Sequence, residues 1–191
     1  DSSEKPRYLC PYTQTAGYII RKNISGSTII LGKPPEGEDK EWIHRSSIRL
    51  GIPKRETAEA LQRARESEAL FRRACKTEGR KLLKELERSG GTGFVLIGRP
   101  YVAYDRYLNM ETAGKISSFG AVPVPADFLP YENEAIGDFW EEVHWEMGRK
   151  LLQAASFTRR HPSLFPVILT SFGCGPDGFI VPFLEEILQD S

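Results

Sequence analysis

The sequence predicts an α/β protein with a doubly wound parallel sheet. Three short apolar runs have the aliphatic and β-branched composition of strands; they are residues 94–97, 121–125 and 167–169. Helical patterns separate these runs, at about residues 108–119 and 138–155, and a third helical pattern follows the last run. Alternating strands and helices form right-handed βαβ units, whose helices cover both faces of a parallel sheet. We therefore expect a Rossmann- or flavodoxin-like βαβαβα domain over residues 90–191.

A long helix is predicted in the N-terminal half, over residues 54–89. This stretch is rich in Ala, Glu, Arg, Lys and Leu, which are strong helix formers, and its apolar residues recur at helical spacing. Gly79 interrupts the apolar stripe, so we expect the helix to bend or divide there. Cys75 lies on the stripe, and we interpret it as a core residue. The helix would connect the second domain to residues 1–53.

Residues 1–53 are interpreted as the N-terminal segment of a truncated first domain. A short helix at residues 16–22, a strand at residues 27–31 and a brief helix around Ile43 and Ile48 are expected within it.

Composition argues against several classes of function. The 26 Lys and Arg residues balance the 26 Asp and Glu residues, so no net field favours nucleic acid or an acidic membrane surface. No apolar run approaches the ~20 residues of a membrane span, and the first residues lack the pattern of a signal peptide. The three cysteines stand far apart and do not form a disulfide framework. We therefore expect a cytoplasmic protein that binds neither nucleic acid nor membrane.

The loop at residues 173–177 is the first candidate site. It follows the last predicted strand and precedes a helix that has Pro182 in its expected first turn. Open α/β sheets bind their ligands at the carboxyl ends of strands. Gly173 and Gly175 flank Cys174 and would let a bulky inorganic group approach the thiol closely. The alternative is a tight turn in which Cys174 only packs.

The loop after the first predicted strand lies on the same rim of the sheet. Gly98 permits a tight turn, and Arg99 is a permanent cation that could hold a phosphate or a CoA-bearing substrate. Tyr101 and Asp105 add polar groups to this loop. The residues match neither the dinucleotide fingerprint nor a P-loop. The alternative is that Arg99 pairs with Asp105 or Asp127 and only fixes the loop.

Cys10 is a second candidate thiol. Pro11 favours extended geometry at Cys10 and the start of a helix just after it. The positive end of a helix dipole favours a thiolate, which suits a metal ligand or a nucleophile. The alternative is an ordinary buried cysteine beside a turn. Hydrolase chemistry has no positive support, because the chain has only three histidines and His144 lacks the spacing of a zinc helix.

Four motifs resemble those of one protein family and occur in the same order. They are residues 8–14 (Tyr-Leu-Cys-Pro-Tyr-Thr-Gln), 95–101 (Val-Leu-Ile-Gly-Arg-Pro-Tyr), 122–130 (Val-Pro-Val-Pro-Ala-Asp-Phe-Leu-Pro) and 172–177 (Phe-Gly-Cys-Gly-Pro-Asp). The chain resembles the CoA-substrate-specific enzyme activase-associated proteins. These are related to the iron–sulfur subunits of 2-hydroxyacyl-CoA dehydratase and benzoyl-CoA reductase.

The resemblance implies an iron–sulfur protein of anaerobic metabolism that takes part in ATP-driven, low-potential electron transfer or reduction. It implies a [4Fe–4S] or related cluster, an ATP-hydrolysing activator as partner and an acyl-CoA as substrate, and it allows a homodimer. The expected metal ligands are Cys10 and Cys174. The expected cofactor-binding residues are Gly98, Arg99, Tyr101, Asp105, Gly173, Gly175 and Asp177.

The chain departs from this pattern in its thiols. A cubane cluster normally takes three or four thiolates, only Cys10 and Cys174 match family motifs, and Cys75 matches none. We therefore expect a fragment, or a chain whose remaining ligands come from elsewhere. The activator's phosphate loops are absent from the sequence, so ATP hydrolysis is not assigned. The chain is expected to be a component of a reductase or dehydratase system or, alternatively, a non-catalytic α/β interaction domain of a larger activase-like polypeptide.

Overall fold

The computed structural model describes residues 11–24, 40–137 and 145–189, and the chain divides into two compact units. The first unit comprises residues 1–71 with 144–146, and the second comprises residues 72–143 with 147–191. The candidate residues that the structure describes all belong to the second unit.

The first unit contains helices α1 (Pro11–Asn23) and α2 (Lys40–Arg49) and the start of α3 (Lys54–Ser89). Helices were predicted at all three places, and α1 begins five residues earlier than expected because Pro11 occupies its first position. The strand expected at residues 27–31 lies outside the described residues.

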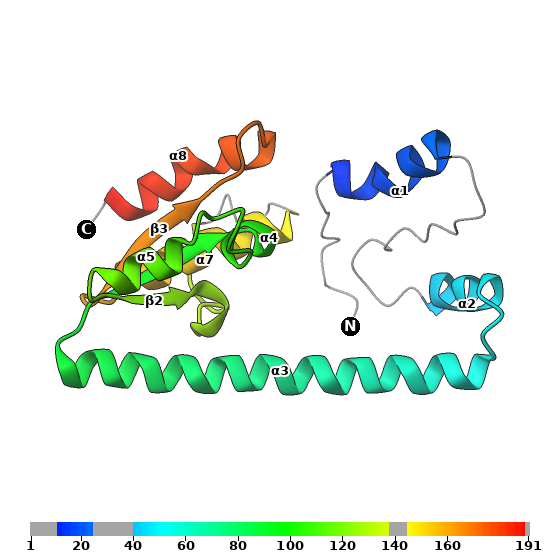
Figure 1. Ribbon diagram of the computed structural model, residues 1–191, viewed down its shortest axis with the longest axis horizontal. Coiled ribbons are helices and arrows are strands. Elements are labelled where there is room, and N and C mark those ends of the chain that lie inside the picture. The colour runs from blue at the N-terminus through cyan, green and yellow to red at the C-terminus, as the bar shows by residue number, and fades with distance from the viewer. Residues whose placement is uncertain (1–10, 25–39, 138–144, 190–191) are drawn as a thin grey trace. The chain divides into compact units, whose positions relative to one another are not determined.

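The second unit contains a three-stranded parallel sheet with the strand order β2-β1-β3, of which strands β2 and β3 are labelled in Figure 1. Its elements after α3 are β1 (Gly93–Gly98), α4 (Pro100–Ala103), α5 (Thr112–Ser118), β2 (Val122–Pro125), the 3₁₀ turn η1 (Ala126–Phe128), α7 (Glu146–Arg159), β3 (Leu164–Leu169) and α8 (Gly175–Gln189). Right-handed crossovers to the two sides of β1 require α5 and α7 to cover opposite faces of the sheet. The predicted doubly wound α/β fold is therefore confirmed.

The central strand β1 forms the core of the second unit. Val95 and Ile97 are fully buried, as are Val124 of β2 and Leu152 of α7. A strand buried on both faces reads as a continuous apolar run, which is why β1 was recognisable in the sequence. Among the described residues, no helix combines the length and the hydropathy that crossing a bilayer requires.

Helix α3 is continuous through Gly79, so the bend or break expected at this glycine is wrong. The missing side chain serves a close contact instead. A Cβ atom at Gly79 would lie only 2.0 Å from the carbonyl oxygen of Phe128, so glycine is needed where η1 approaches the helix. Cys75 lies one turn earlier and is 7% exposed, which confirms its interpretation as a core residue.

Two helix boundaries in the second unit differ from the prediction. The helix expected over residues 108–119 is only α5, since the side chain of Asp105 accepts the amides of Tyr107 and Leu108, both at 2.9 Å, and forms a turn. Met110 and Glu111 then have φ angles of 52° and 55°, which a helix does not allow. In the described part of the helix expected over residues 138–155, α7 begins at Glu146 and extends to Arg159.

Pro182 lies inside α8 rather than in its first turn, because the helix already begins at Gly175. A proline at this depth removes one backbone hydrogen bond of the helix. The expected position was wrong because the turn at Cys174 is shorter than the sequence suggested.

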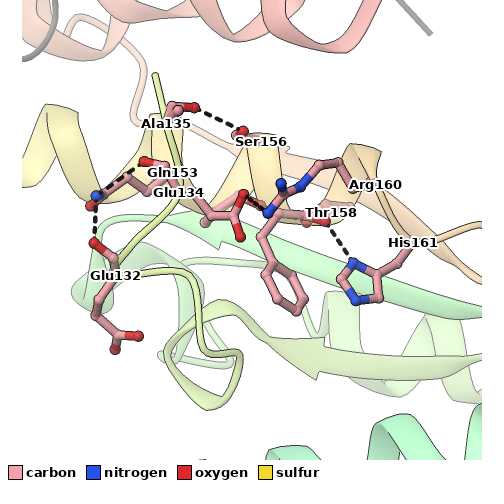
Figure 2. Close-up of polar contacts among 10 residues, drawn as sticks. Glu132, Glu134, Ala135, Gln153, Ser156, Thr158, Arg160 and His161 are labelled. Atoms are coloured by element: carbon pink, nitrogen blue, oxygen red, sulfur yellow. Dashed lines mark hydrogen bonds and ion pairs between the residues drawn. The ribbon is translucent and has the colours of Figure 1, made fainter. Parts of the chain in front are cut away.

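The segment after η1 is held against α7 by side chains of that helix (Figure 2). Gln153 donates from Nε2 to the carbonyl oxygen of Glu132 at 2.8 Å. Ser156 donates from Oγ to the carbonyl oxygen of Ala135 at 3.0 Å. Backbone acceptors of an irregular segment are thus paired, as buried polar groups must be.

Candidate functional site

The candidate site lies where β1 and β3 end next to each other. The two strands stay in register as far as the pair Gly98 and Leu169. A Cβ atom at Gly98 would lie 2.6 Å from the carbonyl oxygen of Leu169, so the glycine allows the strands to approach closely. Gly98 therefore serves the close approach of the two strands rather than a tight turn, because the turn begins only after this residue. The pairing brings the loop after β1 and the loop after β3 to one edge of the sheet.

A buried ion pair joins these two loops. Arg99 Nε lies 2.6 Å from Asp177 Oδ1, and the two residues are only 9% and 3% exposed. Asp177 Oδ2 also accepts the backbone amide of Ser171 at 3.2 Å. The carboxylate therefore connects the end of β1, the loop after β3 and the first turn of α8. Arg99 thus has Asp177 as an ion-pair partner, where the alternative expected Asp105 or Asp127.

The charge state of Arg99 follows from these neighbours. Burial acts to lower the pKa of Arg99, but the Asp177 carboxylate, and then Tyr101 and Cys174, outweigh it. The pKa of Arg99 is therefore raised above its ordinary value. Cys174 and Tyr101 thus both lie near the Arg99 guanidinium.

Cys174 stands directly before α8 in an open turn. Its amide donates to the carbonyl oxygen of Ser171 at 3.1 Å, and its carbonyl oxygen accepts the amide of Gly178 at 2.9 Å. Gly173 has a φ angle of 76°, which favours glycine. A Cβ atom at Gly173 or Gly175 would meet nothing within 4 Å. The thiol is partly exposed, so there is space around it for a bulky group.

Tyr101 and Asp105 differ in their availability for a ligand. The Tyr101 side chain is 48% exposed on α4, beside Arg99. The Asp105 carboxylate accepts the amides of its own turn, which gives this residue a structural task in the loop.

A polar network around Asp127 was missed by the sequence interpretation. Tyr104 donates to Asp127 Oδ2 at 2.6 Å, and Tyr131 donates to Oδ1 at 3.0 Å. Burial and then Asp127 raise the pKa of Tyr131 above its ordinary value. Lys76 contacts the same region, with Nζ 4.7 Å from the centre of the Tyr131 ring. No spacing rule links Tyr104 to the segment that holds Asp127 and Tyr131, so no sequence signal predicted this network.

The described residues do not bring three metal ligands together. Within residues 11–24, 40–137 and 145–189, no group of three or more His, Cys, Asp or Glu side chains is placed to hold a metal ion. Cys10 lies outside the described residues. Cys174 is thus the one candidate thiol whose surroundings are described.

Fold and site together define an α/β domain that carries a partly exposed thiol beside a buried ion pair at the carboxyl edge of a parallel sheet. A profile of the family described as "CoA enzyme activase uncharacterised domain" matches residues 1–129 of the 191-residue chain. The chain therefore belongs to this family. The matched range includes the loop after β1 and ends before the Cys174 loop. No curated protein and no solved structure matches the chain.

Proposed function

We propose that this chain is part of an iron–sulfur protein of the 2-hydroxyacyl-CoA dehydratase and activase-associated type, with Cys174 as a cluster ligand. The observation that carries this proposal is the open, glycine-flanked position of Cys174 at the sheet edge. The chain belongs to the CoA enzyme activase domain family, which supports a role for it in an activase system together with a partner enzyme.

Cysteine binds metal as the thiolate, and positive groups lie beside Cys174. The thiol precedes the N-terminus of α8, a helix of 15 residues, whose dipole stabilises negative charge there. The Arg99 guanidinium adds a positive charge near the thiol. Gly173 and Gly175 leave space for sulfide ions and for amide donors to sulfur, which tune cluster potentials.

The donor set of the described residues fits one cluster ligand but not a complete cluster. A cubane needs three or four thiolates. We propose Cys10 as a second ligand, and the others would have to come from another chain or another part of the polypeptide. Such a cluster would supply one-electron transfer at low potential. The proposed partners are an ATP-hydrolysing activator, an acyl-CoA substrate and a second copy of the chain.

Anaerobic reconstitution with ferrous iron and sulfide tests this proposal. Iron and acid-labile sulfide bound per chain are measured together with the native mass and the visible absorbance. We expect Cys174→Ala and Cys10→Ala each to lower the bound iron, and the matched control Cys75→Ala, at a buried position, to leave it unchanged. Iron bound equally by all variants, or by none including the native chain, would contradict the proposal.

A second candidate function is a non-catalytic interaction domain of a larger activase-like polypeptide. It is favoured by the buried Arg99–Asp177 pair, which joins the loop after β1 to the loop after β3 through protein groups. The side chain of Phe172, two residues before the thiol, is fully exposed, as expected for a contact surface. Native chain that stays colourless after reconstitution, with both Cys10 and Cys174 freely alkylated, would support this function over the first.

A further inference from the structure

A cavity of about 430 Å³ lies between α5 and the β1–β2 side of the sheet. Small-molecule sites typically measure ~300–1,000 Å³. None of the residues that we propose for the cluster site lines this cavity. A ligand bound here would therefore occupy a second, separate site within the same unit.

The sheet side of the cavity is apolar and rigid. Leu96 of β1 pairs with Pro125 of β2, and Pro123 stands two residues before Pro125. These three side chains share one face of the sheet because strand residues alternate between faces. Proline rings have a fixed φ angle and little freedom, so this wall cannot collapse to fill the space.

The helix side of the cavity is formed by small residues. Ala113 and Gly114 of α5 line it, and a Cβ atom at Gly114 would meet nothing within 4 Å. Larger apolar side chains at these two positions would have covered the sheet, as helices over sheets usually do. The chain instead leaves an apolar space open to solvent.

The entrance of the cavity carries an ion pair on a constrained turn. Arg106 Nη2 lies 2.7 Å from Glu111 Oε1, and the two side chains are 74% and 59% exposed. Met110 and Glu111 both adopt left-handed φ angles, a conformation that costs of order 1–3 kcal/mol for residues other than glycine and that is concentrated at functional sites. Buried Asn109 holds this turn by donating to the carbonyl oxygen of Ala103 at 2.9 Å.

We propose that this cavity binds a small amphiphilic carboxylate, with its apolar part against Leu96, Pro123 and Pro125 and its carboxylate at Arg106. An exposed ion pair contributes only about 0–1 kcal/mol, so a ligand carboxylate can replace Glu111 as the partner of Arg106 at little cost. The planar guanidinium can hold such a carboxylate through two hydrogen bonds.

Calorimetric titration of the full chain with hexanoate, hexanamide and hexylamine tests the proposal. We expect saturable binding of hexanoate, tighter than that of hexanamide by up to about fivefold, the ratio that corresponds to about 1 kcal/mol. Gly114→Leu should fill the cavity and abolish binding, whereas the matched control Gly114→Ala should retain it. Arg106→Gln should make hexanoate and hexanamide bind equally.

Three results would overturn the proposal. They are no saturable hexanoate binding, unchanged hexanoate binding by a folded Gly114→Leu variant, and a preference for hexylamine, which would assign the entrance to Glu111. Should Gly114→Leu lose its circular dichroism signal, Arg106→Gln decides alone, because it changes an exposed side chain. None of these results bears on iron binding by Cys174.

Discussion

Cys75 and Cys174 belong to the same compact unit, but their surroundings are opposite. Cys75 lies on α3, one turn before the point where Gly79 meets the backbone of Phe128, and only 7% of it is exposed. Cys174 lies between two glycines around which there is empty space. The difference shows that packing density, rather than residue type, decides which thiol is available for chemistry.

The two regions also differ in how their polar groups are used. Around α3, the Lys76 ammonium lies over the Tyr131 ring, and Tyr131 donates to Asp127. At the sheet edge, Arg99 and Asp177 hold the two loops together, while the thiol beside them is partly exposed. The polar contacts around α3 therefore close that region, whereas the polar contacts at the sheet edge leave Cys174 partly exposed.

The largest expected effect is on thiol reactivity. In a metal-free Cys10→Ala background, iodoacetamide should modify Cys174 at the rate of an accessible thiol. Cys75 should react only when the unit opens, slower by on the order of a thousandfold or more, because opening costs several kcal/mol. Peptide mass spectrometry over time measures both rates. Similar rates for the two thiols would break the comparison.

The next largest effect is expected for the buried ion pair. Asp177→Ala removes the carboxylate that pairs with the buried Arg99 charge and should lower the free energy of unfolding by about 3–5 kcal/mol, measured by urea denaturation. The control Glu78→Ala breaks an exposed pair with Lys81 and should cost about 1 kcal/mol or less. Equal losses of unfolding free energy in the two variants would show that the buried Arg99 charge does not need the Asp177 carboxylate for its stabilisation.

A smaller effect is expected where α3 meets η1. Gly79→Ala should destabilise the unit by about 1–3 kcal/mol, because the new methyl group overlaps the carbonyl group of Phe128. The same substitution at Gly114 meets no atom and should stabilise α5 by up to ~1 kcal/mol through helix propensity. Urea denaturation should therefore show a lower free energy of unfolding for Gly79→Ala and a higher one for Gly114→Ala. A higher free energy of unfolding in both variants would refute the close contact at Gly79.

The smallest effect is expected for Tyr131. Its pKa is raised above the ordinary value of 10.0, first by burial and then by Asp127, so the folded state keeps the proton longer than the unfolded state. The resulting stability is fully present below about pH 10 and is lost as the pH rises towards the folded-state pKa. Tyr131→Phe should flatten this decline in denaturation measured against pH. Tyr107→Phe, at an 86% exposed position, should leave the decline intact.

Much of the fold was predictable because local patterns carry it. The long helix was recognised from its helix formers and their spacing, and it was found over Lys54–Ser89 as expected. The apolar run of β1 and the glycines before it also gave a correct strand. The predictions failed at Gly79 and Pro182, since the role of a glycine or proline depends on the neighbour that it meets.

The candidate site was predictable only in part. Arg99 and Asp177 each follow a predicted strand, so the sequence places both at the same edge of the sheet. It does not predict that the two residues pair with each other. That pairing depends on the register of β1 with β3, which brings Gly98 beside Leu169. The two acids that were considered as partners are used elsewhere, Asp105 within its own turn and Asp127 by two tyrosines.

The sequence by itself determined the order of strands and helices, because hydrophobic periodicity and helix propensity act over neighbouring residues. It also determined that Cys174 would stand between two glycines in a loop before a helix. Only the tertiary structure decided that Asp177 is the partner of Arg99, that Gly79 admits the backbone of Phe128, and that a cavity remains under Gly114. These features arise between residues distant in the chain, where strand register and side-chain volume, rather than local preference, select the contacts.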